Sequence, residues 1–416
     1  MRALLPVALL VVLVAATASP AHAAEPAPRI SAPSAIVVET STGAVAYARR
    51  ADQRRSIASV TKLMTALLTL EQERLSARIT AVRYRPGAAE SQIGLRAGER
   101  LTVADMLRGL LLASANDAAA SLADGVAGSR RAFVKEMNDR ARGLGLARTR
   151  FDDPIGLDAG NRSSARDLVG LTMQLRRFPF FRKTVDRATA TLQTGDRPRS
   201  IANRNALIRE HPWVSGVKTG HTNRAGYVLV GSARRNGVTL VSVVLGTGSE
   251  AARNADTLAL LRHGFRRYTR ATAVRRGKVL ARARIRFRRG AELRLTAART
   301  IRQVVRRGVR PRTRVLSAPA EVEGPIRKGQ RMGQAEVVVD GRRVATVALV
   351  AASAVPAAGV AQRTKDYVTR PFGFALAVLA LAGSVGLLLR RRGRGRGTRP
   401  PRPRPAGGSN SEVEAA

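Results

Sequence analysis

The chain has 416 residues, enough for two or three domains, and it has no cysteine, which excludes a thiol nucleophile, a disulfide framework and thiolate metal sites. Its 73 Lys and Arg residues against 29 Asp and Glu give a net charge of +44, but only 4% of residues are aromatic and no recognition-helix motif is present, so we expect attraction to anionic lipid or wall polymer and no nucleic acid. The four histidines, His22, His211, His221 and His263, form no metal-binding cluster, so we expect no zinc site and no cofactor.

Residues 1–23 have the features of a secretory signal peptide. Arg2 precedes an apolar run from Ala3 to Ala16, and Ala21-His22-Ala23 is an A-x-A cleavage site. An uncleaved anchor is the alternative, but the short run and its small-residue exit favour cleavage after Ala23. The rest of the chain up to the C-terminal anchor described below is therefore expected outside the cytoplasm.

Residues 36–39 and 44–47 flank Thr42-Gly43 and predict a β-hairpin. A buried helix is then predicted to begin near Ser59, in the run Ser59-Val60-Thr61-Lys62. Positions three apart share a helix face, so the Ser59 hydroxyl should lie beside the Lys62 amine. A buried lysine with a lowered pKa can take a proton from a serine.

The rarity of lysine makes this pair more informative. Most of the cationic residues are arginines, and the lysines are only Lys62, Lys135, Lys183, Lys218, Lys278, Lys328 and Lys365. Arginine keeps its proton, so it cannot replace a lysine that acts as a base. S-x-x-K alone remains weak, since Ser59 could be a helix cap and Lys62 a surface residue.

Two further motifs follow along the chain. Thr102 is predicted to cap a helix over 103–113, and Ser114-Ala115-Asn116 comes between it and a second alanine-rich helix. Lys218-Thr219-Gly220 lies on a predicted strand, where Lys218 and Gly220 share a face. Each motif alone has an ordinary structural explanation, a helix break or a strand end. Their joint order with Ser59 and Lys62 is a strong signal.

Strands at both ends of the segment with helices between predict one α+β domain over residues 24–270 in which the first and last segments share an antiparallel sheet. From about residue 271 the pattern alternates in short strands with a turn at Asp340-Gly341, which predicts a small β-rich domain over 271–355. This domain carries no catalytic cluster and is expected to act as a pedestal.

Residues 356–370 are predicted to be a linker. Residues 371–389 are uncharged and apolar, about 28 Å long as a helix, and predict one transmembrane helix. The Arg/Pro/Gly-rich tail over 390–416 is expected to be cytoplasmic by the positive-inside rule, which leaves the catalytic domain extracytoplasmic. The C-terminal helix is thus the expected membrane attachment.

S-x-x-K, an S-x-N relative and K-T-G form the motif set of penicillin-binding proteins and serine β-lactamases. Over roughly residues 30–265 the chain is similar to the serine D-alanyl-D-alanine carboxypeptidases, the low-molecular-weight penicillin-binding proteins of the peptidase S11 type. The resemblance is carried by Ser59-Val60-Thr61-Lys62, Ser114-Ala115-Asn116, Pro154-Ile155-Gly156-Leu157, Ser164-Ala165-Arg166-Asp167, Asn203-Arg204-Asn205 and Gly216-Val217-Lys218-Thr219-Gly220-His221-Thr222. It implies the β-lactamase/penicillin-binding-protein fold, an antiparallel sheet with a helical cluster. A weaker resemblance at residues 324–333 extends to the β-rich domain of this family.

The resemblance also implies roles. Ser59 would attack the carbonyl of the penultimate D-alanine of a peptidoglycan stem peptide, Lys62 would accept its proton, and Ser114 would protonate the leaving D-alanine. Substrate binding would fall to the residues Asn116, Lys218, Thr219, Gly220 and His221, the last through its backbone N–H in an oxyanion hole with that of Ser59. β-Lactam antibiotics would acylate Ser59 as substrate mimics.

Two departures from the family pattern are Ala115, often glycine, and His221, often tyrosine or another residue; neither changes the expected class.

A β-lactamase with the same chemistry is the second hypothesis, after the carboxypeptidase, and a non-catalytic wall- or lipid-binding protein is the third. The β-rich domain, the predicted anchor and the absence of a glutamate deacylation motif argue against the β-lactamase.

Overall fold

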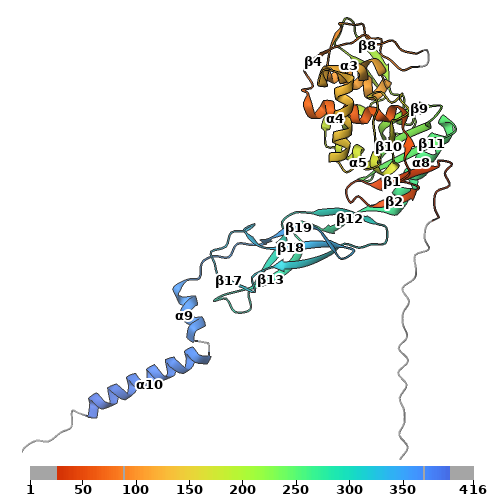
Figure 1. Ribbon diagram of the computed structural model, residues 1–416. Coiled ribbons are helices and arrows are strands. Elements are labelled where there is room, and N and C mark those ends of the chain that lie inside the picture. The colour runs from red at the N-terminus through yellow and green to blue at the C-terminus, as the bar shows by residue number, and fades with distance from the viewer. Residues whose placement is uncertain (1–25, 88–89, 369–370, 394–416) are drawn as a thin grey trace, which may run out of the picture. The chain divides into compact units, whose positions relative to one another are not determined.

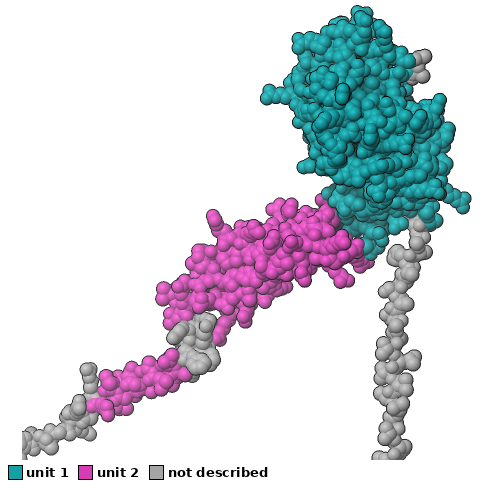
Figure 2. All heavy atoms as spheres, viewed as in Figure 1, with its two compact units in different colours: residues 1–271, 304–309 teal, residues 272–303, 310–416 magenta. Residues whose placement is uncertain are grey.

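The computed structural model describes residues 26–87, 90–368 and 371–393. The predicted signal peptide, residues 1–23, and the predicted tail beyond residue 393 lie outside the described residues. The chain divides into two compact units, residues up to 271 with 304–309 and residues 272–303 with those from 310 on (Figures 1 and 2). We call these unit 1 and unit 2.

Unit 1 contains a five-stranded antiparallel sheet in the order β2-β1-β11-β10-β9. Its strands are β1 (Ser34–Glu39), β2 (Val45–Arg49), β9 (Val214–Thr222), β10 (Gly226–Arg235) and β11 (Val238–Thr247). The first and last segments of the unit do share one sheet, as predicted, because β1 pairs with β11 and Ile36 lies opposite Val243. Asn236 and Gly237 have φ values of 49° and 76°, which makes the tight turn that joins β10 to β11.

Helices cover both faces of this sheet, as Figure 1 shows for α5 and α8. Successive side chains of a strand point to opposite faces. Ile36 and Val38 of β1 accordingly pack in one apolar cluster with the helices that follow Ser59. Ala35 and Val37 pack in another with Leu260 of α8. The helices are α1 (Lys62–Gln72), α2 (Val103–Arg108), α3 (Asn116–Ala127), α4 (Arg130–Gly143), α5 (Ala165–Leu175), α6 (Pro179–Val185), α7 (Leu207–Glu210) and α8 (Glu250–Arg267).

Two short tight segments complete the helical layer, the 3₁₀ turn η1 (Ala58–Thr61) and the π-helical turn η2 (Gly109–Ala113). The helix expected from Ser59 is therefore a 3₁₀ turn followed by α1. Thr102 caps α2 as predicted, since its hydroxyl accepts the N–H of Asp105 at 3.3 Å. Three two-stranded ribbons border the layer: β3 (Arg55–Ser56) with β6 (Arg162–Ser163), β4 (Arg78–Thr80) with β5 (Arg100–Thr102), and β7 (Thr189–Leu192) with β8 (Arg199–Ala202).

Unit 2 is β-rich. Its six-stranded sheet has the order β16-β18-β19-β14-β13-β17 and buries Leu293, Leu295 and Leu349. The strands are β13 (Val279–Ile285), β14 (Glu292–Ala297), β16 (Arg312–Ser317), β17 (Glu321–Val322), β18 (Arg331–Val339) and β19 (Arg342–Ala351). Strands β12 (Tyr268–Val274) and β15 (Ile301–Arg306), which each have residues in both units, form a separate pair.

Two helices follow the β-rich sheet. The segment predicted as a linker contains α9 (Val360–Val368), and α10 (Pro371–Gly393) includes the predicted membrane span. Within the described ranges, however, no helix combines the length and the apolar character needed to cross a membrane. The predicted transmembrane helix at residues 371–389 is therefore not confirmed.

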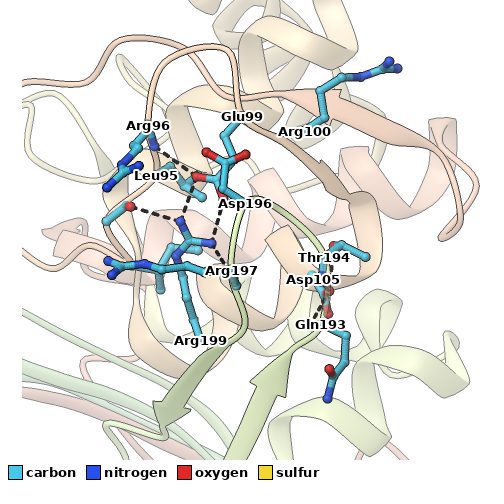
Figure 3. A network of polar contacts seen from close by, with 12 residues as sticks. Leu95, Arg96, Glu99, Arg100, Asp105, Gln193, Thr194, Asp196, Arg197 and Arg199 are labelled. Atoms are coloured by element: carbon cyan, nitrogen blue, oxygen red, sulfur yellow. Dashed lines mark hydrogen bonds and ion pairs between the residues drawn. The ribbon is translucent and has the colours of Figure 1, made fainter.

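Two buried carboxylates hold the hairpin β7–β8 against the start of α2 (Figure 3). Glu99 forms an ion pair with Arg199 at 2.7 Å, and the side chains are only 0% and 7% exposed. Glu99 also accepts the N–H of Asp196 at 2.8 Å, while Asp105 accepts the N–H groups of residues 193 and 194, each at 2.9 Å. Burial alone would raise the pKa of Glu99, but Arg199 and backbone N–H groups hold it below its usual value.

We expect Glu99→Gln to lower the free energy of unfolding of unit 1 by about 3 kcal/mol, because a buried guanidinium loses its counter-charge. Glu71→Gln is the matched control. Its ion pair with Arg140 is 26% and 34% exposed, so the loss should stay below about 1 kcal/mol. Urea unfolding followed by the fluorescence of Trp213, the chain's single tryptophan, measures both. Equal losses would contradict the expectation.

Candidate active site

The Ser59 hydroxyl and the Lys62 amine lie in contact at the start of α1. Lys62 Nζ is 3.1 Å from Ser59 Oγ, and the two residues are joined by the turn η1. Lys62 is 0% exposed, whereas Ser59 is half-buried. A nucleophile at the surface with an amine buried behind it is the arrangement that the three-residue spacing predicts.

Lys62 has two further partners, both brought in from distant segments. Its Nζ donates to Asn116 Oδ1 at 2.6 Å and to the carbonyl oxygen of Ile155 at 2.7 Å. Burial lowers the pKa of Lys62 to about 7, and the carboxylates of Asp153 and Glu90 oppose the shift. A substantial fraction of this amine is therefore uncharged at neutral pH and can accept a proton.

The loop over residues 153–158 delivers the Ile155 carbonyl. The Asp153 carboxylate accepts the backbone N–H of Ile155 at 2.6 Å and of Leu157 at 3.0 Å, and also those of Gly156 and Asp158. Gly156 has a φ of 99°, and a Cβ there would lie 2.1 Å from the carbonyl oxygen of Ala58. Only glycine lets this loop pack on the turn that carries the nucleophile.

Ser114 and Lys218 form a second hydrogen-bonded pair. Lys218 Nζ donates to Ser114 Oγ at 2.8 Å and to its neighbour Thr219 O at 2.8 Å, and Lys218 is 1% exposed. Burial, followed by repulsion from Lys62, lowers the pKa of Lys218 well below its usual value. Ser114 has a left-handed φ of 61° and directly follows η2, so the end of that π turn sets its position.

Strand β9 closes the site along its edge. A Cβ on Gly220 would lie 3.1 Å from Ser59 N and 2.8 Å from Val228, so the strand passes close to the nucleophile only because this residue is glycine. Thr219 is 7% exposed, and the exposed His221 ring stacks on Tyr227 with 4.0 Å between ring centroids. Side-chain hydrogen bonds thus link the site residues in two groups, the first of Ser59, Lys62 and Asn116 and the second of Ser114 and Lys218. Gly220 lies against the first group.

Glu90 belongs to the site, although no residue spacing in the sequence indicates it. Its carboxylate accepts Asn116 Nδ2 at 2.8 Å and the hydroxyl of Tyr84. Burial alone would raise the pKa of Glu90, but the bonds from Tyr84, Gly87 and Asn116 hold it below its usual value. Since Asn116 Oδ1 is bound to Lys62, Glu90 fixes which way that amide faces.

The segment that carries Glu90 is itself held in place. The Ser91 carbonyl accepts the N–H of Asn116 at 2.7 Å, and the Asp117 carboxylate accepts the N–H of Leu95 at 2.9 Å. Arg199 donates to the Gly94 carbonyl at 3.2 Å and so joins the segment to the Glu99 network (Figure 3). No cluster of three His, Cys, Asp or Glu side chains suited to a metal ion exists among the described residues.

A serine beside a buried amine of lowered pKa, with a second serine bound to a second such amine, can carry out nucleophilic acyl transfer. Residues 20–249 match a family model described as D-alanyl-D-alanine carboxypeptidase, Peptidase_S11. Residues 268–357 match a second one described as penicillin-binding protein 5, C-terminal domain.

Individual relatives agree with these matches. The D-alanyl-D-alanine carboxypeptidase DacF of Bacillus subtilis is 31% identical over 327 residues, which cover 76% of this chain and 83% of the relative. DacA of Escherichia coli K12, a D-alanyl-D-alanine carboxypeptidase, is 31% identical over 363 residues, 83% of this chain and 89% of the relative. Among solved structures, penicillin-binding protein 5 from Haemophilus influenzae matches with a TM-score of 0.58 and 29% identity, covering 80% of this chain and 99% of that chain.

We expect Lys62 to titrate near pH 7 and Glu90→Gln to lower its pKa further, because the variant removes a negative charge that stabilises the ammonium form. Nuclear magnetic resonance of the lysine side chains measures this, and Lys62→Arg assigns the signal among the lysines. Glu210→Gln, an exposed glutamate on α7, is the control and should leave the titration unchanged. A pKa of Lys62 near 10.5, its ordinary value, would contradict the expectation.

Proposed function

The chain belongs to the Peptidase_S11 family of D-alanyl-D-alanine carboxypeptidases, and from this membership we propose how its residues divide the work of the reaction. It is a serine-type hydrolase that removes the terminal D-alanine from peptidoglycan stem peptides ending in D-Ala-D-Ala, and it binds β-lactams covalently. Its fold is the α+β fold of penicillin-binding proteins with a β-rich C-terminal domain. The roles of the individual residues are our proposal.

In the first step, Ser59 Oγ attacks the carbonyl carbon of the penultimate D-alanine while Lys62 takes the hydroxyl proton. The contact of 3.1 Å and the pKa of Lys62 near 7 support this assignment. The carbonyl oxygen of that residue becomes an oxyanion, which the backbone N–H groups of Ser59 and His221 stabilise. The close approach of Gly220 to Ser59 N supports the pairing of these two donors.

Collapse of the tetrahedral intermediate breaks the peptide bond, and Ser114 delivers a proton to the leaving D-alanine nitrogen. Its hydrogen bond to Lys218 provides the route by which that proton is replaced. Asn116 positions Lys62 through Oδ1, and its amide N–H group exchanges Glu90 for the substrate when the peptide binds. Lys62 then releases to solvent the proton that it took from Ser59. In its uncharged form it takes a proton from the water that attacks the ester, and this proton passes to Ser59 Oγ as the ester bond breaks and the peptide acid leaves.

Lys218 and Thr219 bind the terminal carboxylate of the substrate. Burial, followed by repulsion from Lys62, lowers the pKa of Lys218 because both disfavour a charged ammonium group. An arriving carboxylate supplies a counter-ion and raises that pKa, so Lys218 takes up a proton as the substrate binds. A substrate without a terminal carboxylate would not cause Lys218 to take up this proton. The site therefore favours substrates with a free terminal carboxylate, as in carboxypeptidase cleavage.

The observation that carries the proposal is the fully buried Lys62 amine in contact with Ser59. We expect Ser59→Ala to abolish the penicillin adduct, detected by intact mass, and to reduce D-alanine release from a pentapeptide ending in D-Ala-D-Ala by about 10³-fold or more. Ser56→Ala, three residues earlier and half-buried, is the control and should keep both activities.

Two outcomes would overturn this proposal. An adduct that persists in Ser59→Ala would place the nucleophile elsewhere. Rapid penicillin turnover by the native chain, without D-alanine release from the peptide, would indicate a β-lactamase.

We also propose that residues 1–23 export the chain and that α10 attaches it to the membrane, with residues 271–355 as a spacer and the tail in the cytoplasm. Three observations support attachment. Apolar side chains of α10 are exposed on more than one face, with Leu379 68%, Leu381 71% and Leu387 64% exposed. The stretch over 371–389 is uncharged, and eight arginines follow it: Arg390, Arg391, Arg392, Arg394, Arg396, Arg399, Arg402 and Arg404.

A chain that ends after residue 370 is expected to leave the membrane fraction and to keep its penicillin-binding activity. A chain that ends after residue 393 retains α10 without the tail and should remain in the membrane fraction after an alkaline wash. Fractionation with detection of the penicillin adduct measures both. Equal distribution of the two truncated chains would exclude α10 as the attachment.

A further inference from the structure

Unit 1 contains a cavity of about 510 Å³ that shares no residue with the candidate active site. It lies where the β10–β11 turn meets the C-terminal end of α8, the first residues of β12 and the turn after β15. Its walls combine four arginines with three aromatic side chains, and none of its lining residues is acidic. The volume is large enough for a small ligand.

The four arginines are Arg235, Arg262, Arg266 and Arg307. Some arginines elsewhere in unit 1 are paired with carboxylates, as in the Arg199–Glu99 and Arg166–Asp52 ion pairs. Among the ion pairs of the described residues, none includes Arg235, Arg262 or Arg307. Several cations that converge on one cavity repel each other, and an anion bound there would relieve the repulsion.

Unpaired arginines are common on a chain with a net charge of +44, so charge alone does not define a site. The aromatic walls provide the second feature. Trp213 packs edge-to-face on Phe265 with 5.8 Å between ring centroids, and both are only half-buried. Arg307 donates to the Phe265 carbonyl at 3.5 Å, which holds a guanidinium beside these rings. A half-buried indole ring beside exposed guanidinium groups suits a ligand with an apolar sugar face and an anionic group.

We propose that this cavity binds a phosphate ester of a sugar or polyol, as carried by an anionic polymer of the cell wall. A guanidinium binds phosphate oxygens through two parallel hydrogen bonds, and a phosphate group can accept from several guanidinium groups at once. Trp213 contacts the sugar or polyol carbons, and Asn236 and Thr269 offer hydrogen bonds to its hydroxyl groups. The site holds the enzyme near its wall substrate without taking part in the acyl transfer.

Trp213 is the only tryptophan, so its fluorescence reports on the cavity directly. The full-length chain is titrated with N-acetylglucosamine 1-phosphate, glycerol 3-phosphate, inorganic phosphate and neutral N-acetylglucosamine. We expect the sugar phosphate to change the emission and to bind most tightly, and the neutral sugar to bind least. Prior acylation of Ser59 with penicillin should not alter these affinities, which separates this cavity from the active site.

Arg262→Gln and Arg307→Gln are each expected to weaken binding of the sugar phosphate about tenfold, because each removes a charge-assisted hydrogen-bond donor. Arg74→Gln, an exposed arginine outside the cavity, is the control and should leave the affinity unchanged. By calorimetry, Trp213→Leu should bind the sugar phosphate no better than inorganic phosphate. Penicillin acylation by all four variants should equal that of the native chain.

Three results would overturn the proposal. The first is an unchanged Trp213 emission together with no heat of binding for any phosphate ester. The second is equal binding of the neutral sugar and the sugar phosphate. The third is binding to phosphatidylglycerol vesicles that requires Arg262 and Arg307 but is not displaced by the soluble esters, since that would assign the cavity to a lipid headgroup.

Discussion

The burial of one amine, that of Lys62, is the constraint on which the catalytic unit depends. A charged ammonium group without solvent is costly, so the group must lose its proton or find acceptors. Lys62 has three acceptors within 3.1 Å, one each from Ser59, Asn116 and Ile155. They keep the amine hydrogen-bonded while burial favours its uncharged form. The same burial that would destabilise an ordinary lysine here produces a base.

The acceptors come from segments far apart in the sequence, and each segment is fixed by contacts of its own. Asp153 folds its loop by binding the N–H groups that follow it, and Gly156 lets that loop pack on Ala58. The Glu90 segment meets the N-terminal end of α3 through Ser91, and the Glu99–Arg199 ion pair holds the far end of that segment. The hydrogen bonds described for these surrounding networks therefore support the geometry of the amine without involving the Ser59 hydroxyl.

The sequence predicted the principal residues of this site because their signals are local or compositional. A three-residue spacing identified Ser59 and Lys62, and the rarity of lysine gave weight to Lys218. Glu90 was missed, and the Asp153 loop was noted only for its family resemblance at residues 154–157 without a role in the site, because their contacts arise only when the chain folds. Alternating patterns predicted the sheet that joins β1 to β11 and the β-rich second unit. Periodicity alone could not predict the π turn before Ser114 or α9 within the predicted linker. It did predict the membrane span, which is not confirmed among the described residues.

The two buried lysines also limit each other. The charge of Lys62 lowers the pKa of Lys218, so it is costly for both amines to be protonated before the substrate binds. In the proposed reaction the substrate carboxylate brings one negative charge and Lys218 takes up one proton, so the net charge near Lys62 does not change. Lys62 then remains uncharged and able to accept the Ser59 proton while the substrate is held. An arginine in place of Lys218 would be charged in both states, which would keep a cation beside the base even before substrate arrives. Lys218 can gain or lose its charge and is therefore compatible with Lys62 as an uncharged base. Arginine, the chain's usual cation, stays charged and is not.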